Sequence, residues 1–274
     1  MTRGRWAAKA LAAAFCLIWA FPVYWMVNTA FKPRSEIFTT TPRFLPEHPT
    51  LANFSTALSQ KQFLTNLGNS VIVVAATVLI SIVVGIFAAA ALSRFRFRGR
   101  RLIMVVILVV QMLPATALLI PMFVMFNNLN LLGTYLALVL AYVATVLPFS
   151  IWVMRGFFVM IPVEIEEAAH IDGASNWRTL ISVLFPLVAP GVIATGIFSF
   201  IAAWNDYLIA YTFMQDESRY TLPLWLASFT NPHTGTDYGT QMAASVIFAV
   251  PFIVFFLLIQ RNLVAGMSAG AVKG

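Results

Sequence analysis

The sequence predicts an all-α integral membrane protein with six transmembrane helices and one short helix on the cytoplasmic surface between the fourth and the fifth. Of its 274 residues, 60% are hydrophobic and 10% are charged, whereas about a quarter are charged in an ordinary soluble domain. Six apolar stretches approach the roughly 20 residues that a helix needs to cross a bilayer. None of them alternates apolar and polar residues as a barrel strand does. We therefore interpret residues 1–274 as a single transmembrane domain.

The six apolar stretches are residues 10–31, 67–92, 102–126, 132–154, 181–203 and 241–260. Within a bilayer the backbone must satisfy its own hydrogen bonds, so each stretch is expected to be helical. The first follows a basic segment, as in a signal peptide, but its length of about 22 residues exceeds the usual apolar region of about 7–15. It is predicted to be an uncleaved span. Prolines inside the stretches can kink helices so that the bundle packs, or they can act as hinges or line a transport pathway. Both interpretations stay open.

Lysine and arginine are distributed unequally between the two sides of the predicted bundle. On the side of the amino terminus lie 12 of the 17, namely Arg3, Arg5, Lys9, Arg94, Arg96, Arg98, Arg100, Arg101, Arg155, Arg178, Arg261 and Lys273. The other side carries 5, namely Lys32, Arg34, Arg43, Lys61 and Arg219. Because basic loops stay in the cytoplasm, both termini are predicted to be cytoplasmic. The run Arg94–Arg101 is interpreted as a topological lock at the headgroups rather than a specific lipid or nucleic-acid site.

The apolar stretches lack the residues that other classes of membrane protein require. Ion-coupled carriers place carboxylates, His or Lys inside their spans, and these spans contain essentially none. The chain has no G-x-x-x-x-G-K-[ST] loop, so the energy for any pump must come from another protein. An intramembrane enzyme would need a nucleophile with a base, or a metal cluster, and neither is visible. Cys16 is the single cysteine, which excludes an intrachain disulfide. We expect no cofactor or metal in this chain, and no nucleic-acid partner.

Residues 162–173 are predicted to form a short helix after the fourth span. Pro162 suits the first turn, three acids complement the positive helix end, and Gly173 supplies the stop. The acids are Glu164, Glu166 and Glu167. Ser175 is expected to cap a second helix that begins at Asn176 and leads into the fifth span. At 1.5 Å per residue the first helix measures roughly 15 Å, which is too short to cross the bilayer, so it must lie on the cytoplasmic surface.

The composition of this short helix favours a protein partner. Its apolar face consists of Ile165, Ala168, Ala169 and Ile171. Small side chains allow a helix to sit closely in a groove, and the surrounding acids can meet basic residues there. The alternative is a helix that rests on lipid, but such helices favour Lys and Arg, and anionic lipid repels acids. The sequence therefore predicts docking into another protein.

The spacing of residues after this helix begins resembles the inner-membrane permease subunits of bacterial ATP-binding-cassette importers. Their signature is Glu-Ala-Ala, three residues, Gly, nine residues, Ile, one residue, and Leu-Pro. The matching residues here are Glu167, Ala168, Ala169, Gly173, Val183, Phe185 and Pro186. Val183 and Phe185 depart from the pattern, each by an apolar exchange. Further segments resemble the carbohydrate-uptake branch, and specifically its smaller, maltose-permease-like partner. They are residues 21–25, 31–33, 69–70, 148–152, 203–206 and 270–274.

The resemblance implies a bacterial inner-membrane protein whose short helix, the coupling helix, docks into a cytoplasmic ATPase. The residues that it assigns to this coupling are Glu164, Glu167, Ala168, Ala169, Asp172, Gly173 and Pro186. It further implies a heterodimer with a second permease chain, two copies of the ATPase that hold ATP and Mg, and an external solute-binding protein. The tail, residues 270–274, would reach the ATPase dimer interface, with a frayed terminus as the alternative.

The solute implied by the resemblance is a sugar, most simply a di- or oligosaccharide. Sugar rings stack on aromatic side chains and their hydroxyls need hydrogen-bond partners. Trp204, Asn205 and Asp206, at the outer end of the fifth span, are the candidate contacts. In the alternative interpretation Trp204 is an interfacial anchor and Asp206 a local cap. A different solute, such as a glycerophosphodiester, is a further alternative, and an ion-coupled secondary carrier is a third.

Overall fold

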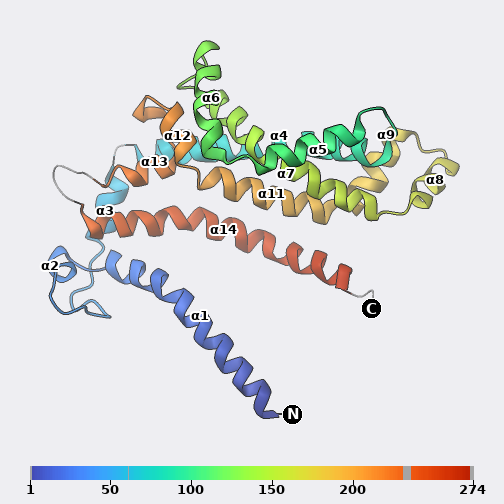
Figure 1. Ribbon diagram of the computed structural model, residues 1–274. Coiled ribbons are helices and arrows are strands. Elements are labelled where there is room, and N and C mark those ends of the chain that lie inside the picture. The colour runs from blue at the N-terminus through green and yellow to red at the C-terminus, as the bar shows by residue number, and fades with distance from the viewer. Residues whose placement is uncertain (1, 61, 231–235, 272–274) are drawn as a thin grey trace. The chain divides into compact units, whose positions relative to one another are not determined.

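The computed structural model describes residues 2–60, 62–230 and 236–271, and it divides them into two compact units (Figure 1). Unit 1 comprises residues up to Leu64 together with Leu222–Ile253, and unit 2 comprises Thr65–Thr221 and the residues from Val254 onward. The elements of unit 1 are α1 (Thr2–Ala30), α2 (Arg34–Ile37), α3 (Ala52–Ser59), α13 (Leu222–Ala227) and the first part of α14 (Tyr238–Ala271). The described residues contain helices and no strands, which confirms the all-α class.

Unit 2 holds most of the remaining helices. They are α4 (Phe63–Arg94), α5 (Arg100–Met112), α6 (Ala115–Asn128), α7 (Tyr135–Met160), α8 (Val163–Ile171), α9 (Asn176–Thr179), the π-helix η1 (Leu180–Leu184), α10 (Phe185–Leu187), α11 (Ala189–Trp204), α12 (Leu208–Phe213) and the 3-10 turn η2 (Glu217–Arg219). Four continuous helices among the described residues are long and apolar enough to cross a membrane: Ala8–Ala30, Phe63–Arg94, Tyr135–Met160 and Tyr238–Gln260. Two bent pairs of helices bring the total to as many as six, in the order that the sequence predicts.

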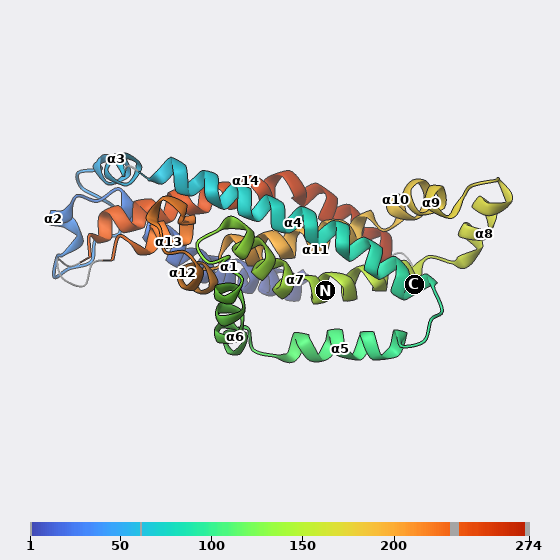
Figure 2. The same cartoon turned by 90° about the horizontal axis from the view of Figure 1, so that it is seen from above.

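The third predicted span, 102–126, consists of two helices. α5 and α6 meet at an angle of 102°. Figure 2 shows the two helices running in different directions. Pro114 lies between them, and Leu113 has an extended backbone with φ −72° and ψ 131°. Proline disfavours the helical conformation of the residue before it, so the helix ends there. Sequence length alone identified the segment but missed this bend.

The fifth predicted span, 181–203, is also bent, by 71° between Asn176–Leu187 and Ala189–Trp204. Pro186 and Pro190 have no backbone N–H, so two hydrogen bonds of a regular helix are missing in this region. The five residues of η1 end two positions before Pro186 and widen the helix to a π turn. The connection from α9 to α11 is therefore an irregular helix.

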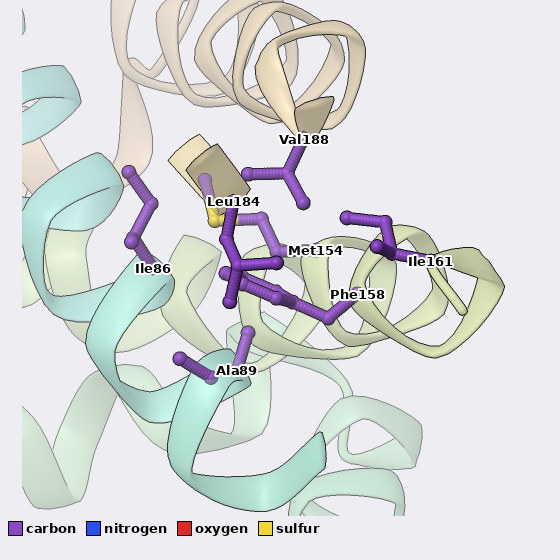
Figure 3. Packing of buried hydrophobic residues seen from close by; sticks show 8 residues of the cluster. Ile86, Ala89, Met154, Phe158, Ile161, Leu184 and Val188 are labelled. Carbon is purple, nitrogen blue, oxygen red and sulfur yellow. The ribbon is translucent and has the colours of Figure 1, made fainter. Parts of the chain in front are cut away.

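A buried cluster joins α4, α7 and η1 (Figure 3). Its residues are Ile86, Ala89, Ala90, Met154, Phe158, Ile161, Leu184 and Val188. Met154, Phe158 and Val188 have no exposed surface. Close to it, Gly191 lets α11 approach α7, because a Cβ there would lie 2.6 Å from Cδ2 of Phe157. This packing fixes the ends of three helices directly beside α8.

A buried carboxylate orders the loop after α1 in unit 1. Glu36 accepts hydrogen bonds from the backbone N–H groups of Glu47 and His48, both at 2.9 Å. Lys32 donates to the carbonyl of Arg43 at 2.5 Å, and its Nζ lies 4.8 Å from the centre of the Trp25 ring. These contacts satisfy charges that are largely removed from water.

Candidate functional site

The helix α8 begins and ends where the sequence predicts. Pro162 occupies the N-cap position, and Gly173 follows the C-cap with φ +82°. The amide of Gly173 donates to His170 O at 3.0 Å, and the amide of Ala174 donates to Ala169 O at 2.9 Å. This pair of bonds is a Schellman motif, which requires a left-handed residue after the C-cap and so favours glycine. The predicted bounds 162–173 agree with the observed helix to within two residues.

Ser175 caps the next helix, as predicted. Its Oγ accepts a hydrogen bond from the amide of Arg178 at 3.3 Å, and α9 begins at Asn176. Trp177 in the first turn of α9 stacks on Phe87 of α4, with ring centres 5.8 Å apart and planes 9° apart. The segment between α7 and α11 is therefore fastened to α4 on the α9 side.

α8 is exposed to solvent over most of its surface. It has no buried residue, and Figure 2 shows it beyond the end of α7. Glu164, Glu167 and Ala168 are exposed, and Ile171 is 86% exposed. Asp172 and Gly173 follow on the same exposed turn. This outward face brings together five of the seven predicted coupling residues and Ile171; the other two, Ala169 and Pro186, do not belong to it.

Two residues of α8 turn toward the body of unit 2. Ala169 and Glu166 are half-buried, so Ala169 does not belong to the outward face on which the sequence placed it. Glu166 forms an ion pair with Arg94, the last residue of α4, and each side chain is 16% exposed. Nη2 of Arg94 also donates to the carbonyl of Ile161 at 3.0 Å. One guanidinium thus joins the ends of α4, α7 and α8.

Sequence reasoning missed this contact. It treated Arg94 as part of a basic run at the headgroups and Glu166 as one of three similar acids. Arg155 makes a related contact, because its Nε donates to Leu92 O at 3.3 Å near the end of α4. Arginines that cap the last carbonyls of a helix also complement its negative end. Arg94 and Glu166 are 72 positions apart, and no pattern in the neighbouring sequence indicates that two such distant residues pair.

A cavity of about 280 Å³ lies behind α8. Its lining includes Arg94, Glu166, His170, Trp177 and Leu184. α8 is therefore held at its inner side by polar contacts around a cavity rather than by a packed apolar core.

Pro186 lies apart from α8 in the chain. Pro186 is exposed in α10, at the bend of the fifth span, after α9 and η1. Its observed structural effect is on that bend. Residues 272–274 of the predicted tail lie outside the described residues.

The three candidate sugar contacts occupy different environments in unit 2. Trp204 is buried and stacks on Phe200, with ring centres 5.5 Å apart. Asn205 is exposed, and its Nδ2 donates to Ile201 O at 2.9 Å. Of the three, Asn205 has the most accessible side chain.

Asp206 organises the start of α12. Its Oδ1 accepts hydrogen bonds from the hydroxyl of Tyr142 at 3.0 Å and from the amides of Ile209 and Ala210, both at 3.1 Å. Burial raises the pKa of Asp206, and the three hydrogen bonds oppose that effect. The geometry is that of a helix cap with a side-chain partner, which was the alternative interpretation of this residue.

Known proteins resemble the chain along nearly its whole length. Residues 81–269 match the family described as the binding-protein-dependent transport system inner membrane component. The diacetylchitobiose uptake system permease protein DasC of Streptomyces coelicolor is 39% identical, over 93% of this chain and 92% of the relative. The trehalose/maltose transport system permease protein MalG of Thermococcus litoralis is 36% identical, over 96% of this chain and 94% of the relative.

A solved structure shares the fold. It is a bacterial ABC transporter involved in the import of the acidic polysaccharide alginate, and one of its chains matches with a TM-score of 0.82 at 23% identity, over 93% of this chain and 94% of the other. The match shows that the two chains share a fold. With the family match over residues 81–269 and two relatives above 30% identity, this chain belongs to the family of binding-protein-dependent transport system inner membrane components.

Proposed function

We propose that this chain is the permease subunit of an ATP-driven importer of a di- or oligosaccharide. Membership of the binding-protein-dependent family carries the proposal. Relatives that cover more than nine-tenths of the chain are named for diacetylchitobiose and for trehalose and maltose. A third, the galactooligosaccharides transport system permease protein GanQ of Bacillus subtilis, is 30% identical over 96% of this chain.

The energy for transport comes from a separate ATPase that holds ATP and Mg. The charged residues of the apolar helices stand at their ends, as Arg94 does in α4, and no Asp or Glu lies within the sequence of α4, α7 or α11. This distribution disfavours the ion-coupled carrier, because such carriers move a charge inside the membrane. The permease itself transmits work and performs no chemistry.

The outward face of α8 is the docking surface for that ATPase. Glu164 and Glu167 offer negative charge, Ala168 allows close approach, and Ile171 offers an exposed apolar side chain. An acidic helix with small residues fits a groove that has basic walls. The end of unit 2 that carries Arg94–Arg101 and α8 is then cytoplasmic, as are both termini.

The complete importer contains a second permease chain as heterodimeric partner, two ATPase subunits and an external binding protein. A solved structure similar to this chain, with a TM-score of 0.68, is an alginate ABC transporter in complex with a periplasmic protein that holds an alginate pentasaccharide. ATP binding in the partner supplies the free-energy difference that drives the pathway between inward- and outward-facing states. Asn205 is the most accessible of the candidate contacts for the solute.

The proposal is tested by deleting the gene in the native host and measuring uptake of radiolabelled diacetylchitobiose, maltose, trehalose and a galactooligosaccharide. We expect uptake of at least one of these sugars to fall to background and to return with the wild-type gene. Unchanged uptake of all four, together with loss of glycerophosphodiester uptake, would replace the sugar by the alternative solute. Uptake that follows an ion gradient after the ATPase is removed would restore the secondary carrier.

A further inference from the structure

We propose that α4 receives the movement of the coupling helix directly, and that Arg94 and Glu166 are the positioning residues that make this connection. The inference rests on the proposed docking of α8 to an ATPase. It concerns the path by which the movement reaches the bundle, since the chain itself connects α8 only to α7 and, through α9, to α11.

The Arg94–Glu166 ion pair is the specific side-chain link between α4 and α8. Both side chains are 16% exposed, so solvent screens their attraction less than it screens a surface pair. Arg94 also donates to Ile161 O at 3.0 Å, which fixes the direction of its guanidinium. A planar guanidinium carries several donors in a rigid fork, so it holds two partners in a more defined geometry than a lysine ammonium does.

Packing contributes little to the position of α8. The helix has no buried residue, and the cavity of about 280 Å³ lies between it and the body of unit 2. Its inner side therefore depends on polar contacts, and Glu166 provides the charged one. If that contact is removed, α8 keeps its covalent ends and its outward face, but its lateral attachment to α4 is lost.

α4 is well placed to pass a displacement into the bundle. Ile86, Ala89 and Ala90 of α4 belong to the same buried cluster as Met154 and Phe158 of α7 (Figure 3). Trp177 of α9 stacks on Phe87, one residue from this cluster in sequence. The segment between α7 and α11 is thus tied to α4 on both sides of Gly173, by an ion pair on one side and by a ring stack on the other.

Loss of the Arg94–Glu166 ion pair weakens the coupling between ATP hydrolysis and solute transport without stopping either process. ATPase docking uses the outward face of α8, which Arg94 does not touch, so ATP hydrolysis continues. Delivery of the movement to α4 becomes less efficient, so less solute moves for each ATP hydrolysed. Two sites are coupled by a free energy that passes through the contacts between them, so weakening one such contact lowers the coupling while each site keeps its own activity.

The test uses the complete importer, purified from the native host with its ATPase and second permease and reconstituted in proteoliposomes. Its binding protein is supplied after loading with radiolabelled diacetylchitobiose or maltose, whichever the wild type transports. The variants are Arg94→Ala, Glu166→Ala, the double variant and the exchange Arg94→Glu with Glu166→Arg. Arg98→Ala, an exposed arginine of the same basic run, is the matched control. Sugar uptake, ATP hydrolysis and co-purification of the ATPase are measured for each.

We expect each single variant to lower the sugar moved per ATP by about five- to tenfold, with ATPase co-purification unchanged. The double variant should lose no more than either single variant, the exchange should recover part of the ratio, and Arg98→Ala should match the wild type. A wild-type ratio in both single variants, or additive losses with no recovery in the exchange, would overturn the proposed tie while leaving docking intact. Failure of the wild-type chain itself to co-purify with an ATPase would contradict the proposed function instead.

Discussion

Tyr142 donates its hydroxyl hydrogen to Oδ1 of Asp206 over 3.0 Å, and the same oxygen caps the first turn of α12. We therefore expect Asp206→Ala to lower the free energy of unfolding by about 1–3 kcal/mol, because three donors lose their acceptor. Asp206→Asn, which retains one oxygen, should cost less. Thermal unfolding of the detergent-purified chain measures both changes. A loss of sugar uptake in Asp206→Ala with an unchanged melting temperature would instead assign Asp206 to the solute.

Glu36 gives the loop after α1 a dependence on pH. Burial raises the pKa of Glu36, but the amides of Glu47 and His48 and the nearby positive charges outweigh it, so the pKa lies below its ordinary value of 4.5. Its contribution to stability is therefore present above that value and is lost as the pH falls through the lower, folded pKa. The melting temperature of the wild type should fall between neutral pH and about pH 3.5 more steeply than that of Glu36→Gln. Parallel curves for the two chains would contradict the assignment.

The contact of Gly191 with Phe157 leaves no room for a methyl group. A Cβ at position 191 would lie 2.6 Å from the Phe157 ring, so Gly191→Ala should destabilise the chain by about 1–3 kcal/mol. Gly156→Ala is the matched control, because a Cβ there meets nothing within 4 Å and alanine favours a helix. Combining Gly191→Ala with Phe157→Leu should restore part of the loss. Equal melting temperatures for Gly191→Ala and Gly156→Ala would show that α11 can shift at no cost.

The backbone conformation of Gly173, rather than the room around it for a side chain, limits which residues can replace it. Its φ is +82°, and nothing lies within 4 Å of an added Cβ. We expect Gly173→Asn to retain most sugar uptake, because asparagine tolerates the left-handed region, whereas Gly173→Val should lose most of it. Uptake assays with matched expression compare the two. Equal uptake would show that the turn after α8 does not set the position of the docking face.

The sequence predicted the local features of this fold better than the contacts between distant segments. Pro162, Gly173 and Ser175 act on neighbouring backbone, so the start of α8, its end and the cap of α9 were predictable. Pro114 was visible too, but the 102° angle that follows depends on what α5 and α6 pack against. The pairing of Arg94 with Glu166 and of Tyr142 with Asp206 depends on tertiary structure. The sequence does not distinguish these residues from residues of the same types that lie unpaired on a surface.

The proposed docking of the outward face of α8 to the ATPase is tested most directly by photo-crosslinking in intact cells. A photoreactive phenylalanine analogue at Ile171, which is 86% exposed on α8, should crosslink to the ATPase subunit. The same analogue at Phe97, which is 42% exposed in the basic run, serves as the control and should give little of that product. We expect a strong crosslink to the ATPase from position 171 and a weak one from position 97. Crosslinking of position 171 to lipid alone, with the ATPase present and the importer active, would contradict it.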